Sequence, residues 1–206
     1  LNKGGSAFDA TIATDLALTV CFPNAGNISG GGFLVYRTAS GEVGSLDYRE
    51  KAPLSAYEKM YLDVNGDVIP EKSTLGGLAV GVPGTVAGLV EIHSKFGTLP
   101  WEDLVKPAID LATNGYIVTH KQERSLKSKK DDFIKINGAK TFYAQDFKAG
   151  DTVKNIALAE TLKRISKYGA KGFYQGPVAE SLIKRVREAG GIITHEDLIK
   201  YKPVWR

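Results

Sequence analysis

The sequence predicts an α+β fold that is mostly helical and contains one β-hairpin. Several long segments place apolar residues at helical spacing and end at glycine or proline, whereas only two short runs read as strands. A hydrophobic share of 43% and a charged share of 24% are ordinary for a folded protein, so disordered and fibrous classes are excluded. Because 206 residues show no repeat and no linker, we expect one domain or one part of a larger one.

The first predicted helix spans about residues 7 to 20. Ser6 has the side chain of an N-cap, and Pro23 lies just beyond the end of the pattern. Small and branched apolar residues alternate around the helix, which favours close packing and burial on nearly all sides.

The predicted hairpin comes next, and helices follow it. Its strands are FLVYR (33–37) and VGSLDY (43–48), joined by TASGE, a short glycine-containing loop typical of a hairpin. The segments VPGTVAGLVEIHSKFG (82–97) and PWEDLVKPAIDLATNG (100–115) then have helical spacing and end at glycine. Further helices are expected at about residues 120–131, 156–168, 177–189 and 195–201, with an irregular surface excursion over residues 134–151.

Charge, cysteine content and hydropathy exclude several classes. The net charge is only +4, and the lysine-rich run 127–132 ends in two aspartates without aromatic residues, which indicates a solvated helix end and no nucleic-acid partner. The single cysteine, Cys21, excludes an internal disulfide, and its apolar neighbours favour burial. Asp15 interrupts the longest apolar run, so no membrane span is expected. Because the chain starts at Leu1, we expect its true N-terminus to be missing, which leaves targeting open.

Three consecutive glycines, Gly30 to Gly32, resemble a phosphate-binding loop at first sight. A P-loop needs a lysine and a hydroxyl residue after its glycines, and this run has neither. A dinucleotide site needs a helix after the glycines, whereas here a helix precedes them and a strand follows. We therefore expect no nucleotide cofactor, and we interpret the glycines as allowing either a close backbone approach or a positive φ.

Two threonine–histidine pairs and a third histidine are weak candidates for catalysis or metal binding. Thr119 and Thr194 each precede a helical pattern, and Thr194 with Asp197 resembles a capping box, so we interpret both threonines as helix caps. His93 lies on a helix with no other ligand at metal spacing, which favours a structural or surface role. The chain is thus expected to contain no catalytic residue and no metal site.

Arg49, in the stretch LDYREKAP, is the remaining candidate. Strand alternation places Leu46 and Tyr48 on one face and Arg49 on the other, just before a turn. On residue chemistry alone, Arg49 is either a surface residue paired with Asp47 or Glu50, or a binding residue. In the second case its planar guanidinium would hold a carboxylate by two parallel hydrogen bonds.

Taken together, the motifs resemble one known family. GGSAFDATIA, then P-x-A-G-N-x-x-GGGF, DYREKAP and GVPGTVAGL are similar to the large subunit of γ-glutamyltranspeptidases. The similarity continues through KFGTLPWEDLVKPAIDLATNGYIV, GDTVKNIALAETLKRIS, GFYQGPVAESLIKRV and GGIITHEDLIKY. It covers essentially all of residues 1–206, in order, so this chain is identified as part of such a large subunit.

The resemblance implies a place in the N-terminal-nucleophile hydrolase superfamily, with a four-layer αββα sandwich. Such proteins cleave themselves into a large and a small subunit, and the threonine that opens the small subunit attacks the γ-glutamyl amide of glutathione or a related compound. Its own α-amino group can act as the general base. The γ-glutamyl group then passes to water or to an amino acid or peptide acceptor. No cofactor is implied, and the implied location is periplasmic or extracellular.

The resemblance also assigns roles to residues of this chain. Neither Thr119 nor Thr194 corresponds to the family's nucleophile, which is expected in the small subunit, the implied partner. Arg49 matches the arginine that binds the α-carboxylate of the glutamyl group, and is the one substrate-binding residue expected here. A poly-γ-glutamate depolymerase, an acylase and a non-catalytic homologue remain as alternatives.

Overall fold

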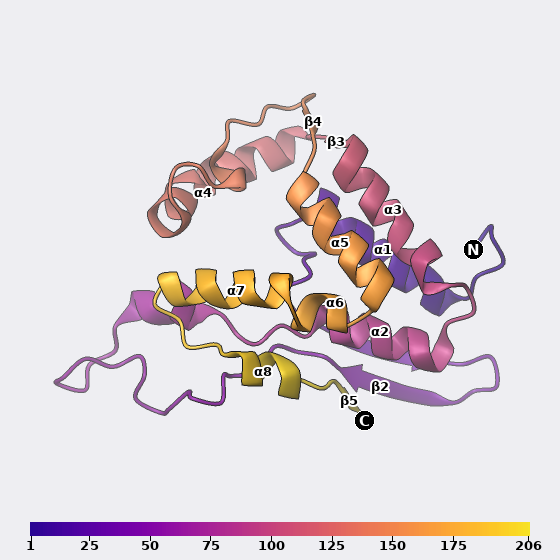
Figure 1. Ribbon diagram of the computed structural model, residues 1–206, viewed down its shortest axis with the longest axis horizontal. Helices are drawn as coiled ribbons and strands as arrows, with labels where there is room; N and C mark the ends of the chain where they lie inside the picture. Colours follow the sequence, from indigo (N-terminus) through magenta and orange to yellow (C-terminus); the bar gives the residue numbers. More distant parts are fainter.

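The computed structural model describes all residues, 1–206, and shows the expected mixture of many helices and few strands (Figure 1). The α-helices are α1 (Ala7–Cys21), α2 (Thr85–Phe96), α3 (Trp101–Asn114), α4 (His120–Asn137), α5 (Ile156–Tyr168), α6 (Lys171–Tyr174), α7 (Pro177–Glu188) and α8 (His195–Lys200). The strands are β1 (Phe33–Arg37), β2 (Val43–Asp47), β3 (Tyr116–Ile117), β4 (Thr152–Val153) and β5 (Val204–Trp205). Short 3-10 turns, η1 (Pro70–Ser73), η2 (Gly77–Ala79) and η3 (Phe142–Ala144), complete the fold.

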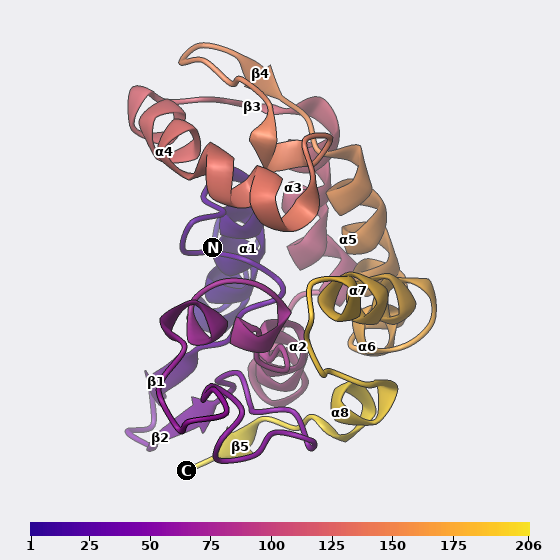
Figure 2. The same cartoon turned by 90° about the vertical axis from the view of Figure 1, so that its left-hand side faces the viewer.

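The elements divide between two ends of the molecule. α4 and the β3–β4 pair lie at one end, and the three-stranded sheet with α8 lies at the other (Figures 1 and 2). Between them, one continuous core of 26 buried residues joins α1, α2, α3, α5, α6, α7 and α8 to β2. Fully buried side chains such as Leu16, Leu89 and Leu162 each contribute about 1.5–3 kcal/mol to folding. No helix is both long enough and apolar enough to cross a membrane.

The sheet has the order β1-β2-β5, with both neighbouring pairs antiparallel. The predicted hairpin is confirmed, with Leu34 opposite Leu46 and Val35 opposite Ser45. One face of the sheet packs on the helices. The other face leaves Phe33, Val35 and Val43 exposed, as an apolar surface that nothing in this chain covers.

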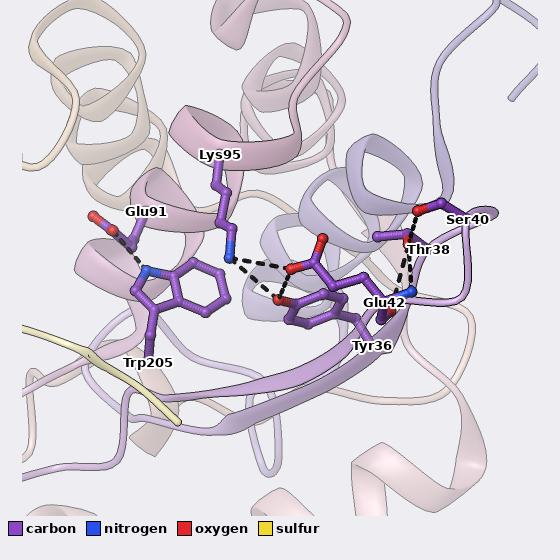
Figure 3. Close-up of polar contacts among 7 residues, drawn as sticks. All are labelled: Tyr36, Thr38, Ser40, Glu42, Glu91, Lys95 and Trp205. Atoms are coloured by element: carbon purple, nitrogen blue, oxygen red, sulfur yellow. Dashed lines mark hydrogen bonds and ion pairs between the residues drawn. The ribbon is translucent and has the colours of Figure 1, made fainter.

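Lys95 and the side chains of Tyr36 and Trp205 join the sheet to α2 (Figure 3). Lys95 on α2 donates to the hydroxyl of Tyr36 at 3.2 Å, and its ammonium lies 4.3 Å from the ring centroid of Trp205. The indole N–H of Trp205 donates to Glu91 at 2.8 Å. Cation–π contacts of this kind contribute about 0.5–2 kcal/mol, so α2 holds both β1 and β5 in place.

Helix α1 starts at a complete capping box, which confirms Ser6 as the N-cap. The carboxylate of Asp9 is buried and accepts hydrogen bonds from the backbone N–H of Ser6 at 2.7 Å and of Thr98 at 3.0 Å, and from both hydroxyls. Burial alone raises the pKa of this carboxyl, but the hydrogen bonds from Thr98 and Ser6 outweigh burial and hold the pKa well below its usual range. Asp9 thus ties the start of α1 to the α2–α3 connection.

Three expectations need correction. α1 is not covered on all sides, since Thr11 and Thr14 are exposed. α4 continues to Asn137, six residues beyond the expected end at residue 131. It stops at Gly138, whose φ is 81°. No residue of α4 is fully buried, and its apolar residues near the C-terminal end, such as Phe133 and Ile134, are half-buried. Cys21 is half-buried rather than buried.

Candidate functional site

Arg49 lies just after the end of β2, where strand alternation placed it. Leu46 and Tyr48 are buried in the core, whereas the side chain of Arg49 is 65% exposed. An open groove of about 480 Å³ lies elsewhere, between α4, α7 and the η1–η2 turns. The segment around Arg49 is distinguished instead by how firmly its backbone is held.

The glycine run lies directly against this segment. Gly32 and Tyr48 exchange two backbone hydrogen bonds, of 3.0 and 3.3 Å. A Cβ atom on Gly31 would lie 2.6 Å from the carbonyl oxygen of Tyr48, closer than side chains approach. None of Gly30 to Gly32 has a positive φ. The first alternative, a close backbone approach, is therefore confirmed, and the positive φ is wrong.

The start of α2 closes the other side of the same segment. A Cβ atom on Gly84 would overlap the carbonyl oxygen of Tyr48, so only glycine fits there. The carbonyl of Gly30 accepts from the backbone N–H groups of Gly84 and Thr85 at 2.7 and 3.0 Å. Three backbone segments therefore meet here: the glycine run, the main chain at Tyr48 and the start of α2. Glycine is needed on both sides of Tyr48, and the carbonyl of Gly30 is the hydrogen-bond acceptor for the first N–H groups of α2.

Both polar backbone groups of Arg49 are themselves held by side chains. Its N–H donates to a carboxylate oxygen of Asp47 at 3.1 Å, and its carbonyl accepts from the hydroxyl of Tyr201 at 2.8 Å. Further along, Lys51 and Val82 exchange backbone hydrogen bonds of 3.2 and 2.7 Å. The main chain at Arg49 is thus fixed before and after the residue.

The guanidinium of Arg49 is much less engaged than its backbone. Its Nε lies 3.4 Å from a carboxylate oxygen of Glu50, and its Cζ lies 5.9 Å from the ring centroid of Phe33. The two terminal nitrogens of Arg49 donate no hydrogen bond within the chain. Of the two suggested ion-pair partners, Glu50 is therefore the observed one, and a pair of parallel N–H groups remains available for a carboxylate.

Asp47 is the partner of a different arginine. Its carboxylate accepts from Arg206 at 2.8 Å. The hydrogen bond from Arg206, and next that from the N–H of Arg49, lower the pKa of Asp47 below its usual range. Asp47 therefore stays charged and keeps its hold on the Arg49 backbone at neutral pH.

The threonine and histidine candidates have structural roles, as expected. The Thr119 hydroxyl accepts from the N–H of Gln122 at 3.2 Å, and that of Thr194 accepts from the N–H of Asp197 at 3.3 Å. Both are complete capping boxes. A ring nitrogen of His93 lies 2.8 Å from the carbonyl oxygen of Leu99. None of these side chains lies beside Arg49.

Sequence reasoning missed Tyr201 and Gly84 as parts of this site. Tyr201 is 152 residues away from Arg49 in the chain, and its hydroxyl finds a partner only through the tertiary fold. Gly84 looked like part of an ordinary helix start. No local pattern distinguishes either residue from its neighbours.

Comparison with known proteins agrees with the resemblance. The family model for gamma-glutamyltranspeptidase matches residues 1–206. The chain is 44% identical to the glutathione hydrolase proenzyme of Pseudomonas aeruginosa, covering 100% of this chain and 37% of that protein. The chain therefore spans little more than a third of the length of this relative.

Solved structures agree in fold as well. The crystal structure of Helicobacter pylori gamma-glutamyltranspeptidase matches with a TM-score of 0.95 and 47% identity, covering 100% of this chain and 60% of that one. The transpeptidase enzyme CapD of Bacillus anthracis matches with a TM-score of 0.77 and 31% identity, covering 100% of this chain and 63% of that one. The fold is thus a mostly helical part of the N-terminal-nucleophile hydrolase αββα sandwich, and the chain belongs to the gamma-glutamyltranspeptidase family.

Proposed function

We propose that the full-length protein is a γ-glutamyltransferase and hydrolase. It cleaves the γ-glutamyl amide of glutathione and related compounds, and it transfers the glutamyl group to water or to an amino acid or peptide. The family match over the whole chain and the relative named as a glutathione hydrolase support this activity. Within this chain, Arg49 binds the α-carboxylate of the glutamyl group.

The observation that carries the role of Arg49 is the contrast between its backbone and its side chain. The backbone is held at 3.1 Å by Asp47 and at 2.8 Å by Tyr201, while the terminal guanidinium nitrogens are free to donate. A fixed backbone sets the direction in which the side chain leaves the main chain, so only the side chain, and not the backbone, has to be ordered when a ligand binds. Two parallel N–H groups match the two oxygens of a carboxylate, which a lysine ammonium cannot do.

The nucleophile is proposed to come from a second subunit of the same precursor. The hydroxyls of Thr119 and Thr194 are both committed to helix caps, so neither is poised to attack an amide. In the proposed reaction the oxygen of a small-subunit threonine attacks the γ-carbonyl carbon and the amine leaves with a proton. The resulting ester is then attacked by water or by the acceptor amine, which returns the proton to the threonine.

The test is Arg49→Ala in the full-length protein. The Arg49 side chain is 65% exposed in this chain, and we expect the bound substrate and the small subunit to enclose it. Removing one partner of an enclosed carboxylate–arginine pair costs about 2–5 kcal/mol. At 1.4 kcal/mol per decade, kcat/KM should fall about 30- to 4,000-fold for γ-glutamyl anilides with a free α-carboxylate. Substrates with an amidated α-carboxylate should be little affected. Arg49→Lys should recover only part of the loss, because a point charge cannot form both hydrogen bonds.

Self-cleavage provides the control, since the bond cut in the precursor carries no glutamyl carboxylate. Arg49→Ala should therefore still yield two subunits on a denaturing gel. If the processed variant prefers the free carboxylate as strongly as the parent does, Arg49 does not bind it.

A further inference from the structure

The last residues of the chain run along the segment that contains Arg49. Strand β5 pairs with β2, with Trp205 opposite Leu46 and Val204 opposite Asp47. Beyond the strands the same antiparallel course continues, because the hydroxyl of Tyr201 donates to the carbonyl of Arg49 at 2.8 Å. We call residues 197–206 the C-terminal strap.

Two more contacts extend the strap past Arg49. The ammonium of Lys51 donates to the carbonyl of Lys202 at 2.7 Å. The backbone N–H of Leu54 donates to a carboxylate oxygen of Asp197 at 2.6 Å, the same Asp197 that completes the cap of α8. The strap therefore accompanies residues 46–54 along their whole length, and Tyr201 is its contact with Arg49 itself.

The surroundings of Tyr201 fix its ring and keep its hydroxyl protonated, so that it can donate a hydrogen bond. Its side chain is buried, and its ring lies parallel to that of Tyr174, with centroids 6.0 Å apart. The ammonium of Lys51 lies 5.0 Å from the ring centroid of Tyr201. Burial, and then the negative charges of Asp47 and Glu50, raise the pKa of Tyr201 to about 12, so the phenol keeps its proton.

The hydroxyl of Tyr201 has one acceptor, the carbonyl of Arg49, and Gly84 leaves the room that it needs. It is the one hydrogen-bond donor to the carbonyl of Arg49 within the chain. Gly84 makes the approach possible, since a Cβ atom there would overlap the Tyr201 oxygen. Without the hydroxyl, the peptide after Arg49 would lose its only hydrogen-bond restraint at that carbonyl.

We propose that Tyr201 is a positioning residue for Arg49. By holding the carbonyl of Arg49, its hydroxyl sets the direction in which the guanidinium leaves the main chain. An arginine side chain is long, so a tilt of about 10–20° at its Cα displaces the guanidinium by about 1–2 Å, enough to spoil two parallel hydrogen bonds. This inference rests on the proposed role of Arg49.

The experiment uses the full-length enzyme and compares Tyr201→Phe with the parent. Phenylalanine keeps the buried ring and removes only the oxygen. A net hydrogen bond is worth about 0.5–1.5 kcal/mol, so KM for a γ-glutamyl anilide with a free α-carboxylate should rise about 2- to 12-fold at 1.4 kcal/mol per decade. The value of kcat and the KM for the α-amidated substrate should stay unchanged.

Tyr174→Phe is the matched control. Tyr174 is the buried stacking partner of Tyr201, but its hydroxyl donates to the carbonyl of Pro83 at 2.8 Å and makes no hydrogen bond to Arg49 or to the strap. It should lower stability without changing the preference for the free carboxylate. In the Arg49→Ala background, Tyr201→Phe should have no further effect on that preference, because Tyr201 acts through Arg49.

The outcomes separate this inference from the proposed function. If Arg49→Ala leaves the preference intact, the proposed role of Arg49 fails first. If Arg49→Ala abolishes the preference but Tyr201→Phe leaves it at the parental value, only the role of Tyr201 is overturned. That role is also overturned if Tyr201→Phe raises KM equally for both substrates, if Tyr174→Phe reproduces its effect, or if the Tyr201→Phe protein does not fold and process.

Discussion

The buried carboxylate of Asp9 should be a main determinant of stability at neutral pH. Its two oxygens accept five hydrogen bonds, from two N–H and two hydroxyl groups of Ser6 and Thr98, and at 3.4 Å from the N–H of Leu99. Asparagine has nearly the same shape but only one acceptor oxygen. Each oxygen of Asp9 accepts from a backbone N–H, one from Ser6 and the other from Thr98. In Asp9→Asn the NH₂ group therefore faces one of these N–H groups in either orientation of the amide, and that N–H loses its acceptor.

The cost can be worked out from these contacts. A buried N–H left without an acceptor costs about 1–3 kcal/mol, and the remaining hydrogen bonds lose the help of the charge. We expect Asp9→Asn to lower the free energy of unfolding by about 2–4 kcal/mol at pH 7. Urea unfolding of the 206-residue chain, followed by circular dichroism, measures this. Asp131→Asn, an exposed carboxylate on α4, is the control and should stay within about 0.5 kcal/mol of the parent.

The pH dependence gives a second, independent check. Because folding lowers the pKa of Asp9, its contribution is fully present above the unfolded pKa of about 3.9 and is lost as the pH falls toward the lower folded value. The gap between parent and Asp9→Asn should therefore narrow below about pH 4. A gap that stays constant from pH 7 to pH 3, or a loss below about 0.5 kcal/mol at pH 7, would refute this reasoning.

Two further predictions concern the 206-residue chain by itself. It should not hydrolyse a chromogenic γ-glutamyl anilide, because its threonine candidates are helix caps; turnover that disappears in Thr119→Ala or Thr194→Ala would show otherwise. It should also associate at high concentration through the edge of β1 and the exposed Phe33, Val35 and Val43. Light scattering should show this association weakened in Val35→Glu but not in Val64→Glu, an exposed valine outside the sheet, and a parent that stays monomeric would contradict it.

Local sequence determined the helix starts and the side on which Arg49 lies. The side chains of Ser6, Thr119 and Thr194 each accept a hydrogen bond from the backbone N–H three residues later. Such a contact is local, so it needs no tertiary structure to form. The alternation from Leu46 to Arg49 follows from the two-residue period of a strand, and the short loop 38–42 placed β1 beside β2. The combined motifs also resemble one family through their sequence alone.

Tertiary structure alone brought Tyr201 and Gly84 to the segment that contains Arg49. The strap pairs with β2 across more than 150 residues, and the two-residue strand β5 has no recognisable pattern of its own, because its stability comes from its neighbours rather than from propensity. Gly84 must be glycine only because three backbone segments cross there. The end of α4 is set by Gly138, whose positive φ of 81° stops the helix after Asn137.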